Sequence, residues 1–268
     1  MAASDKQAAR LTRLFHKACA GYGLIEEGDH ILVGLSGGKD SLALVELLGR
    51  RAQIYVPRFR VTAVHVRVKE RNYQADMSWL EAFCASVKVP LIVRDTEIGE
   101  RPTPTNVLRT AIGSPIEQSS SPVKGREINN PCFLCSWYRR KALFDLAQEL
   151  GCNKIALGHH RDDVAQTLLM NMIYQGTFAT IPPRLKMEKM PLTIIRPLYL
   201  IDEADIARYA EEQGWPKPPK LCPYEHVTSR ESAKELLVHI RTMNPEAMNS
   251  LYGAMTNIKQ EYLPQESE

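Results

Sequence analysis

One stretch, residues 31–48, constrains the fold of this 268-residue chain more than any other. An apolar run at 31–33 stops at a turn rich in glycine and serine, and apolar residues then recur at helical spacing. This order predicts a strand, a tight turn and a helix N-terminus. The first turn of a helix carries unpaired N–H groups and the positive end of the dipole, so it suits an anion. Gly37 and Gly38 would let the backbone approach a ligand and adopt positive φ, and Lys39 would add a cationic donor.

The turn does not follow the commonest nucleotide-binding motifs. A Walker A loop, G-x-x-x-x-G-K-[ST], would need a glycine at Val33 and a hydroxyl residue at Asp40. The dinucleotide fingerprint G-x-G-x-x-G does not fit either. The pattern S-G-G-K-D-S, from Ser36 to Ser41, instead resembles the pyrophosphate loop of the ATP-pyrophosphatase (PP-loop) superfamily, whose members cleave ATP between the α and β phosphates to adenylylate a substrate. The alternative is a tight turn with incidental glycines.

Length and composition are those of an ordinary globular protein, with 44% hydrophobic and 24% charged residues. The length fits one large α/β domain, alone or with an appendage. A net charge of +3 permits a nucleic-acid partner without requiring one. We expect neither a membrane span nor a signal peptide, because no apolar run is long enough and the first ten residues are polar or small. Six cysteines without a secretion signal favour the reduced cytoplasm over a disulfide framework.

Strand and helix patterns alternate along the chain, which predicts a doubly wound parallel sheet with helices on both faces. We expect strands at 31–33, 61–68, 91–93, 154–157 and 192–195. Besides the helix after the turn, we expect helices at 5–20, 74–87, 136–150, 164–174, 202–213, 229–242 and 245–262, with Asp202 as a cap.

This pattern divides the chain into three parts. Residues 1–28 would hold a basic amphipathic helix, 29–215 the PP-loop domain, and 216–268 a cysteine-bearing strap and C-terminal helices. The basic face of the first helix is either a solvated surface or a contact for RNA phosphates. Residues 96–131 are rich in Pro, Ser, Thr, Asn and Gly, and we expect a mobile flap beside the active site or a disordered segment.

A second polar cluster, G-H-H-R-D-D, begins at Gly158, directly after an expected strand. In open parallel sheets, ligands lie at the carboxyl ends of the strands. Asp162 and Asp163 open a helix, where the dipole stabilises a carboxylate. One of them could instead bind a Mg²⁺ ion that neutralises triphosphate charge. The two histidines of the cluster could contact phosphate or substrate, or simply pack.

The third group of candidate functional residues consists of cysteines. Cys132 and Cys135 make a C-x-x-C pair ahead of a helix, and Cys222 lies in the proline-rich strap. Such a pair fits a redox dithiol, zinc, an iron–sulfur cluster or a persulfide relay. A thioredoxin-like role is disfavoured because the motif does not follow the first strand of such a unit. With His226, the three cysteines would complete a Cys₃His zinc set. We expect buried apolar positions for the others, Cys19, Cys84 and Cys152.

Together these motifs resemble the tRNA 2-thiocytidine synthetase (TtcA) group of the PP-loop superfamily over about residues 30–240. The resemblance rests on the 36–41 loop, Cys132-x-x-Cys135 followed by Arg139-Arg140, L-G-H-H-R-D-D-x-x-Q-T from Leu157, I-R-P-L from Ile195, and C-P-Y from Cys222. It implies an adenine nucleotide alpha hydrolase-like fold. It also implies adenylylation of a cytidine O2 in tRNA by ATP, followed by replacement of that oxygen by sulfur.

The resemblance further implies a [4Fe-4S] cluster on Cys132, Cys135 and Cys222, whose open iron would take sulfide supplied by a cysteine desulfurase or from solution. A homodimer is implied as well. The nucleotide would contact Ser36, Gly37, Gly38, Lys39, Asp40, Ser41, His65 and Gly158. The catalytic groups would be Lys39, Asp40, Arg139, Asp162 and Asp163, with Asp162 as the Mg²⁺ ligand.

The chain departs from relatives of this group in four ways. It lacks the terminal zinc ribbons of thiouridine synthetases, which favours the thiocytidine branch. After the second strand it has His65-Val66-Arg67, where relatives carry an acidic residue. Arg139 stands where thiouridine relatives have lysine; it could clamp a phosphate but could not act as a base. The strap has C-P-Y rather than a second C-x-x-C, so three cluster ligands are available.

Two other functions remain open from the sequence. One is an ATP-dependent ligase or amidating enzyme that acts on another acceptor and holds structural zinc. The other is a non-enzymatic, ATP-dependent RNA-binding module. For tRNA phosphates, the candidate contacts are Arg139, Arg140, Arg184 and the N-terminal helix, with surface solvation as the alternative.

Overall fold

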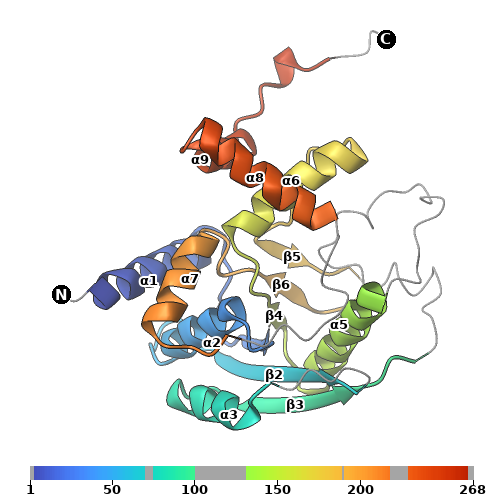
Figure 1. Ribbon diagram of the computed structural model, residues 1–268. Helices are drawn as coiled ribbons and strands as arrows, with labels where there is room; N and C mark the ends of the chain where they lie inside the picture. The colour runs from blue at the N-terminus through green and yellow to red at the C-terminus, as the bar shows by residue number, and fades with distance from the viewer. Residues whose placement is uncertain (1–2, 70–74, 100–130, 189, 218–228, 265–268) are drawn as a thin grey trace.

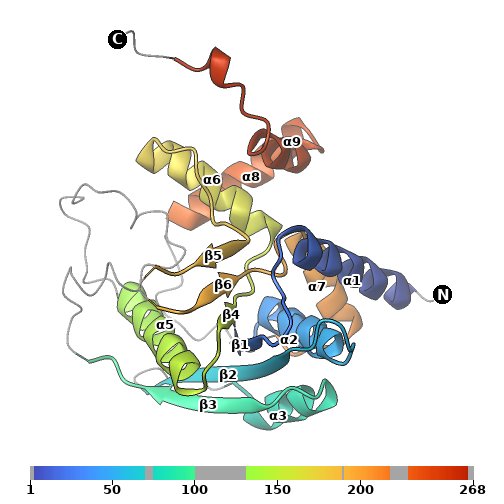
Figure 2. The same cartoon turned by 180° about the vertical axis from the view of Figure 1, so that it is seen from behind.

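A computed structural model describes residues 3–69, 75–99, 131–188, 190–217 and 229–264. Within these residues a six-stranded sheet has the order β3-β2-β1-β4-β6-β5 (Figure 1, and Figure 2 for the label of β1). Its parallel strands are β1 (His30–Gly34), β2 (Arg60–Val68), β3 (Leu91–Thr96), β4 (Lys154–Ala156) and β6 (Thr193–Ile195). The edge strand β5 (Arg184–Lys186) is antiparallel to β6.

The central strand explains why both faces of the sheet are covered. Ile31, Leu32 and Val33 are all fully buried, as expected for a parallel strand between two layers of helices. Side chains alternate between the faces of a strand. Ile31 and Val33 accordingly pack in one hydrophobic cluster, and Leu32 packs in another. Val33 is in register with Ala63 of β2 and Ala156 of β4, so these strands end close together.

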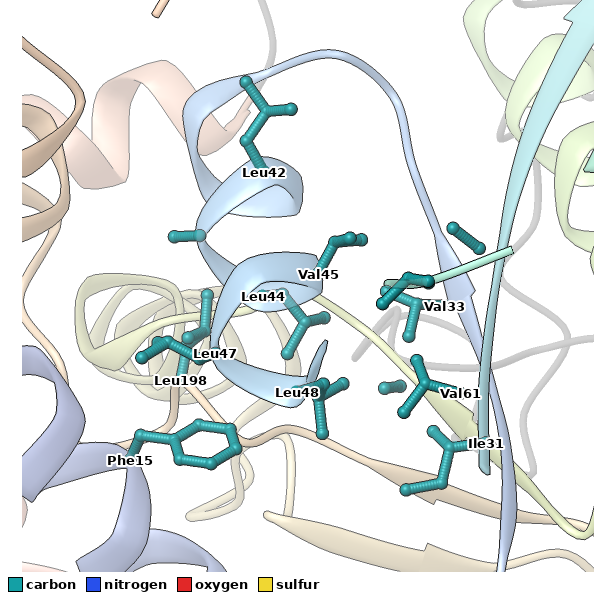
Figure 3. Packing of buried hydrophobic residues seen from close by; sticks show 14 of the residues in the cluster. Phe15, Ile31, Val33, Leu42, Leu44, Val45, Leu47, Leu48, Val61 and Leu198 are labelled. Carbon is teal, nitrogen blue, oxygen red and sulfur yellow. The ribbon is translucent and has the colours of Figure 1, made fainter. Parts of the chain in front are cut away.

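The larger cluster lies on the face covered by α2 (Lys39–Ala52). Figure 3 shows Leu44, Val45 and Leu48 of this helix directed toward the sheet residues Ile31 and Val33. The same cluster includes side chains of α1 (Ala3–Gly21), α3 (Met77–Ser86) and α7 (Glu203–Glu212). Burial of this cluster therefore fixes the N-terminus of α2 beside β1.

The second cluster lies on the opposite face, beneath α5 (Pro131–Glu149). Viewed from behind (Figure 2), α5 runs along β2 and β3, where its Leu143 and Phe144 join Leu32 and Val64 in the core. A third, smaller cluster joins α6 (Arg161–Gln175), α8 (Ser229–Met243) and α9 (Ala247–Ala254) above the carboxyl end of β4 (Figure 1). The short 3₁₀ helix η2 (Gln260–Tyr262) follows.

The predicted doubly wound α/β fold is confirmed, and every expected strand is present. β5 was missed because it is a three-residue edge strand inside a polar loop, too short for its alternation to be recognised. The expected single helix at 245–262 is wrong: α9 ends at Ala254, and a separate 3₁₀ turn follows. α3 begins at Met77 rather than at residue 74, because the Asp76 carboxylate accepts the N–H of Trp79 and caps the helix.

Parts of two predicted segments lie outside the described residues. These are residues 100–130 of the flap and residues 218–228, which include Cys222 and His226. Across the part of the chain that the structure describes, no helix combines the length and the apolar character needed to cross a bilayer.

Candidate functional site

The loop between β1 and α2 opens onto an uncapped helix N-terminus. Gly37 has φ +84°, a left-handed conformation that favours glycine. Gly38 occupies the N-cap position with φ −78°, so the expectation of positive φ at this residue is wrong. Among the residues that the structure describes, no side chain caps the first turn of α2, which starts at Lys39. Its leading N–H groups are therefore left to water or to a ligand.

Two serines hold the loop closed. The hydroxyls of Ser36 and Ser41 lie 3.1 Å apart. The Ser41 Oγ also donates to the carbonyl of Gly38 at 2.8 Å, and the Ser36 Oγ accepts the N–H of Gly38 at 3.3 Å. These bonds set the width of the loop. They also place the hydroxyls of Ser36 and Ser41, both predicted to contact phosphate, next to each other.

Lys39 is held by two carboxylates. Its Nζ lies 3.1 Å from both oxygens of Asp40 and 3.1 Å from Oε1 of Glu203, the first residue of α7. Burial alone would lower the pKa of Lys39, but the two carboxylates outweigh it and the pKa is raised. The ammonium group therefore stays charged at the mouth of the loop.

The strand-end cluster predicted after β4 meets this loop. A Cβ added at Gly158 would lie 3.4 Å from the backbone carbon and oxygen of Asp40. His160 is buried between carboxylates: its Nε2 lies 3.9 Å from Oδ1 of Asp40 and 3.4 Å from Oδ2 of Asp163, and its Nδ1 lies 3.8 Å from Oδ2 of Asp162. The structure thus brings together two motifs that are far apart in the sequence.

The two adjacent aspartates have different contacts. Asp162 accepts the backbone N–H of Glu203 at 2.7 Å and also pairs with the guanidinium of Arg241 on α8. Asp163 accepts the backbone N–H of His160 at 2.9 Å and so caps its own helix. Its side chain is 26% exposed, against 13% for Asp162. Asp163 therefore keeps more acceptor capacity for a ligand.

Three helix N-termini converge at this point, those of α2, α6 and α7. Lys39 at the start of α2 contacts Glu203 at the start of α7, and Asp162 in the first turn of α6 contacts Glu203 as well. Each N-terminus carries a positive partial charge. Together with Lys39 they make a site suited to a polyanion.

A cavity of about 170 Å³ opens beside the loop. Within it, the Nδ1 of buried His65 donates to the carbonyl of Leu35 at 2.8 Å, and burial lowers the pKa of His65. The imidazole is therefore neutral, and its Nε2 is left as an acceptor. The cavity is lined by Gly34, Leu35, Ser36, Val64, His65, Val66, Arg139, Arg140 and Leu143.

A second cavity, of about 310 Å³, lies on the α7 side of the loop. Its walls include Lys39 and Asp40 together with Trp215 and Lys217. Among the described residues, both of these cavities adjoin the loop and both have mostly apolar walls, and the second also bears Lys217.

Arg139 and Cys135 lie four residues apart in α5, so they share a face of this helix and are separated by about 6 Å of rise. The Nε of Arg139 is buried with no hydrogen-bond partner among the described residues. Cys135 has a free, half-buried thiol, and Cys132 lies one turn earlier in the helix. The meeting of this pair with Cys222 stays a prediction, because Cys222 lies outside the described residues.

Three further cysteines and Arg184, also singled out in the sequence, lie among the described residues. Cys19, Cys84 and Cys152 are buried, as predicted. Arg184 donates to the carbonyl of Gly23 at 2.8 Å and pairs with Glu26, a contact that ties β5 to the loop after α1. Among the described residues, no three His, Cys, Asp or Glu side chains are arranged to hold a metal ion on their own.

The sequence patterns predict no role for Glu203, and Arg196 enters only as part of the I-R-P-L motif. Glu203 is the first helical residue after Asp202, in the segment that follows β6. Because ligands in open α/β sheets lie beyond the carboxyl ends of the strands, this position could have been predicted as part of the site. Arg196 also follows β6 and is fully buried, which lowers its pKa to about 10. Its Nε donates to the Nδ1 of His159 at 3.3 Å. Asp202 does stand at the N-cap of α7, but its carboxylate pairs with Arg161 instead of capping the helix.

Comparison with known proteins gives the family of the chain. Residues 4–113 match a family model described as a PP-loop domain. A tRNA-cytidine(32) 2-sulfurtransferase from Syntrophotalea carbinolica is 34% identical over 97% of this chain and 93% of its own length. The corresponding protein of Alkalilimnicola ehrlichii is 33% identical over 95% of this chain and 74% of its own length.

The fold has a solved counterpart in the U34-tRNA thiolase NcsA from Methanococcus maripaludis, determined with its [4Fe-4S] cluster. That structure superimposes with a TM-score of 0.69 and 23% sequence identity, covering 98% of this chain and 82% of the other. This superposition shows that the two proteins share the same arrangement of helices and strands. The sequence relatives cover nearly the whole chain, and they confirm the predicted family: this chain belongs to the tRNA-cytidine(32) 2-sulfurtransferases of the PP-loop superfamily.

Proposed function

We propose that the protein is an ATP-dependent tRNA sulfurtransferase that adenylylates the O2 of a cytidine, at position 32 as in its named relatives, and replaces it with sulfur. One observation carries the proposal. The phosphate-binding loop adjoins both the strand-end cluster, through the approach of Gly158 to Asp40, and the helix that bears the C-x-x-C pair, through the cavity that Ser36 and Arg139 both line.

The nucleotide is assigned to this site by charge and polarity. The triphosphate lies over the three converging helix N-termini, with Lys39 on the β and γ phosphates. Adenosine occupies the cavity with apolar walls at Leu35, Val64 and Val66, where the Nε2 of His65 accepts a hydrogen bond. Ser36 and Ser41 hydrogen-bond to phosphate after their mutual contact opens.

Mg²⁺ fits the carboxylates of this site. The ion usually takes one or two protein carboxylates and completes its shell with phosphate oxygens and water, so a three-residue cage is not required. Asp162 and Asp163 are the candidates, and the contacts favour Asp163, since both oxygens of Asp162 already accept hydrogen bonds. When bound, Mg²⁺ neutralises charge on the departing pyrophosphate.

The first chemical step is then an in-line displacement. The O2 of the cytidine attacks the α phosphorus, the bond to the bridging oxygen breaks, and pyrophosphate leaves with the electron pair. Lys39 and the helix N-termini stabilise the charge that develops on this leaving group. Arg139, whose buried Nε lacks a protein partner among the described residues, donates to the α-phosphate oxygens. It cannot serve as a base at ordinary pH.

The second step replaces the activated oxygen. A [4Fe-4S] cluster on Cys132, Cys135 and Cys222 would supply the sulfur, and AMP leaves from the same carbon. The C-x-x-C spacing is one used by cluster ligands, and the free, half-buried thiol of Cys135 suits a ligand. One helical turn separates Cys135 from the Arg139 that lines the cavity, so sulfur and adenylylated base would meet near α5.

The partners that we propose are tRNA, a sulfur donor and a second copy of the chain. Arg140 lines the same cavity as Arg139 and is a candidate for tRNA phosphate. The donor is a cysteine desulfurase or free sulfide. Light scattering of the purified protein, with and without tRNA, tests the homodimer.

Metal analysis after anaerobic purification tests the function most directly. Iron and labile sulfide near four per chain support the sulfurtransferase. One zinc without iron would instead support a ligase with a structural site on Cys132, Cys135, Cys222 and His226. Nucleoside mass spectrometry of tRNA from a deletion strain gives the second test. The proposal requires that 2-thiocytidine disappears and returns when the gene is restored.

A further inference from the structure

Glu203 makes ion pairs with two lysines from different parts of the chain. Its Oε1 lies 3.1 Å from the Nζ of Lys39 in the phosphate-binding loop, and its Oε2 lies 3.5 Å from the Nζ of Lys234 on α8. Burial alone would raise the pKa of Glu203, but the two lysines lower it, so the carboxylate is ionised. Its backbone N–H donates to Asp162, which fixes this end of α7 against α6.

The position of Glu203 creates a competition for Lys39. The ammonium group has two carboxylate partners, Asp40 and Glu203. Asp40 is its neighbour in the same helix, whereas Glu203 comes from a separate element. A triphosphate over the N-terminus of α2 carries more charge than one carboxylate, so it would draw Lys39 away from Glu203. The Glu203 carboxylate would then keep its ion pair with Lys234.

We propose that Glu203 is a positioning residue that holds Lys39 until a triphosphate displaces it, after which Glu203 keeps its ion pair with Lys234. Through this exchange, nucleotide binding would change the contacts of α8, the helix that carries Lys234. The same helix is also held by the ion pair between Arg241 and Asp162. α8 directly follows, in the sequence, the segment that carries Cys222. The inference rests on the proposed function in one respect: ATP binds at the loop.

A double-mutant cycle tests the competition. Titration calorimetry with a non-hydrolysable ATP analogue compares the wild-type chain with Glu203→Gln, Lys39→Gln and the double variant. Glu203→Gln should lower the Kd about two- to fivefold, because an ion pair of this exposure no longer has to be broken. In the Lys39→Gln background the same change should have no effect. The matched control is Glu212→Gln, which removes the same charge from the exposed far end of α7 and should leave the Kd unchanged.

Hydrogen–deuterium exchange tests the link to α8. The analogue should slow amide exchange in α8 of the wild-type chain, and Lys234→Gln should abolish this protection without changing the fold. Protection that survives in Lys234→Gln would overturn the link.

The outcomes separate this inference from the proposed function. If the wild-type chain binds the analogue but Glu203→Gln binds it equally or more weakly, the competition is wrong and the function stands. The competition is also wrong if the gain in affinity persists without Lys39. If the wild-type chain binds no ATP analogue at all, both proposals fail.

Discussion

Gly158 lies against the backbone of Asp40, at a distance where a Cβ would just touch the Asp40 carbonyl at 3.4 Å. This contact joins the carboxyl end of β4 to the first turn of α2. It is why the aspartates after β4 reach the phosphate-binding loop. Only a residue with a small side chain preserves that spacing.

Enlarging Gly158 should therefore impair nucleotide binding in proportion to side-chain volume. Gly158→Ala places a methyl group at ordinary contact distance, and its Kd for ATP should stay within about twofold of wild type. Gly158→Val pushes its branches into the Asp40 backbone, and an overpacking cost of about 1–3 kcal/mol in the binding-competent loop would raise the Kd about five- to 150-fold. Calorimetry measures both, with circular dichroism as the check of folding. Equal affinities for Ala and Val would show that the contact does not control the loop.

His65 should make the protein less stable in mild acid. Burial lowers its pKa below the ordinary value of 6.5, so below that pH the unfolded chain takes up a proton that the folded chain does not. The free energy of unfolding should thus fall as the pH decreases from 7 to 5, by at most about 1.4 kcal/mol per pH unit for this residue. His16 and His30 act in the same direction.

His65→Asn isolates this contribution, because the Asn amide can still donate to the carbonyl of Leu35. Urea unfolding at pH 7.5 and 5.5 should show a smaller difference for this variant than for wild type. The exposed His239→Asn is the control and should keep the wild-type difference. An unchanged pH dependence in His65→Asn would contradict the prediction.

Much of the site was predictable, because its parts are local sequence patterns at the ends of parallel strands. Residues 36–41 and 158–163 were found this way, and the strand order brings them together. Glu203 was not found, since its importance comes from a contact with Lys39 that depends on how α7 packs against α2. Likewise, the sequence offered a Mg²⁺ role and a capping role for both aspartates. In the structure, the contacts of Asp162 with Arg241 and the Glu203 backbone, and the greater exposure of Asp163, distinguish them.

The cysteines should differ sharply in reactivity. Burial raises the pKa of Cys19 to about 12 and that of Cys84 to about 11, so at pH 8 about one in a thousand or fewer of these thiols is ionised. In metal-free protein, a maleimide should modify Cys135 quickly and leave these two intact until the chain unfolds. Peptide mass spectrometry measures this. Reconstitution with iron and sulfide should then protect Cys135, whereas persistent labelling would argue against its role as a ligand.

The two neighbouring aspartates provide the sharpest test of the metal assignment. Asp163→Asn should raise the Mg²⁺ concentration needed for half-maximal pyrophosphate release by about tenfold, because it removes a charged ligand. Asp162→Asn should leave that concentration within about twofold of wild type. It should instead lower the free energy of unfolding by about 1 kcal/mol, since the partly exposed Arg241 loses its ionic partner. If the two variants exchange these effects, Asp162 is the metal ligand. The pairing with Arg241 must then open when Mg-ATP binds, and the release of α8 would become part of the catalytic cycle.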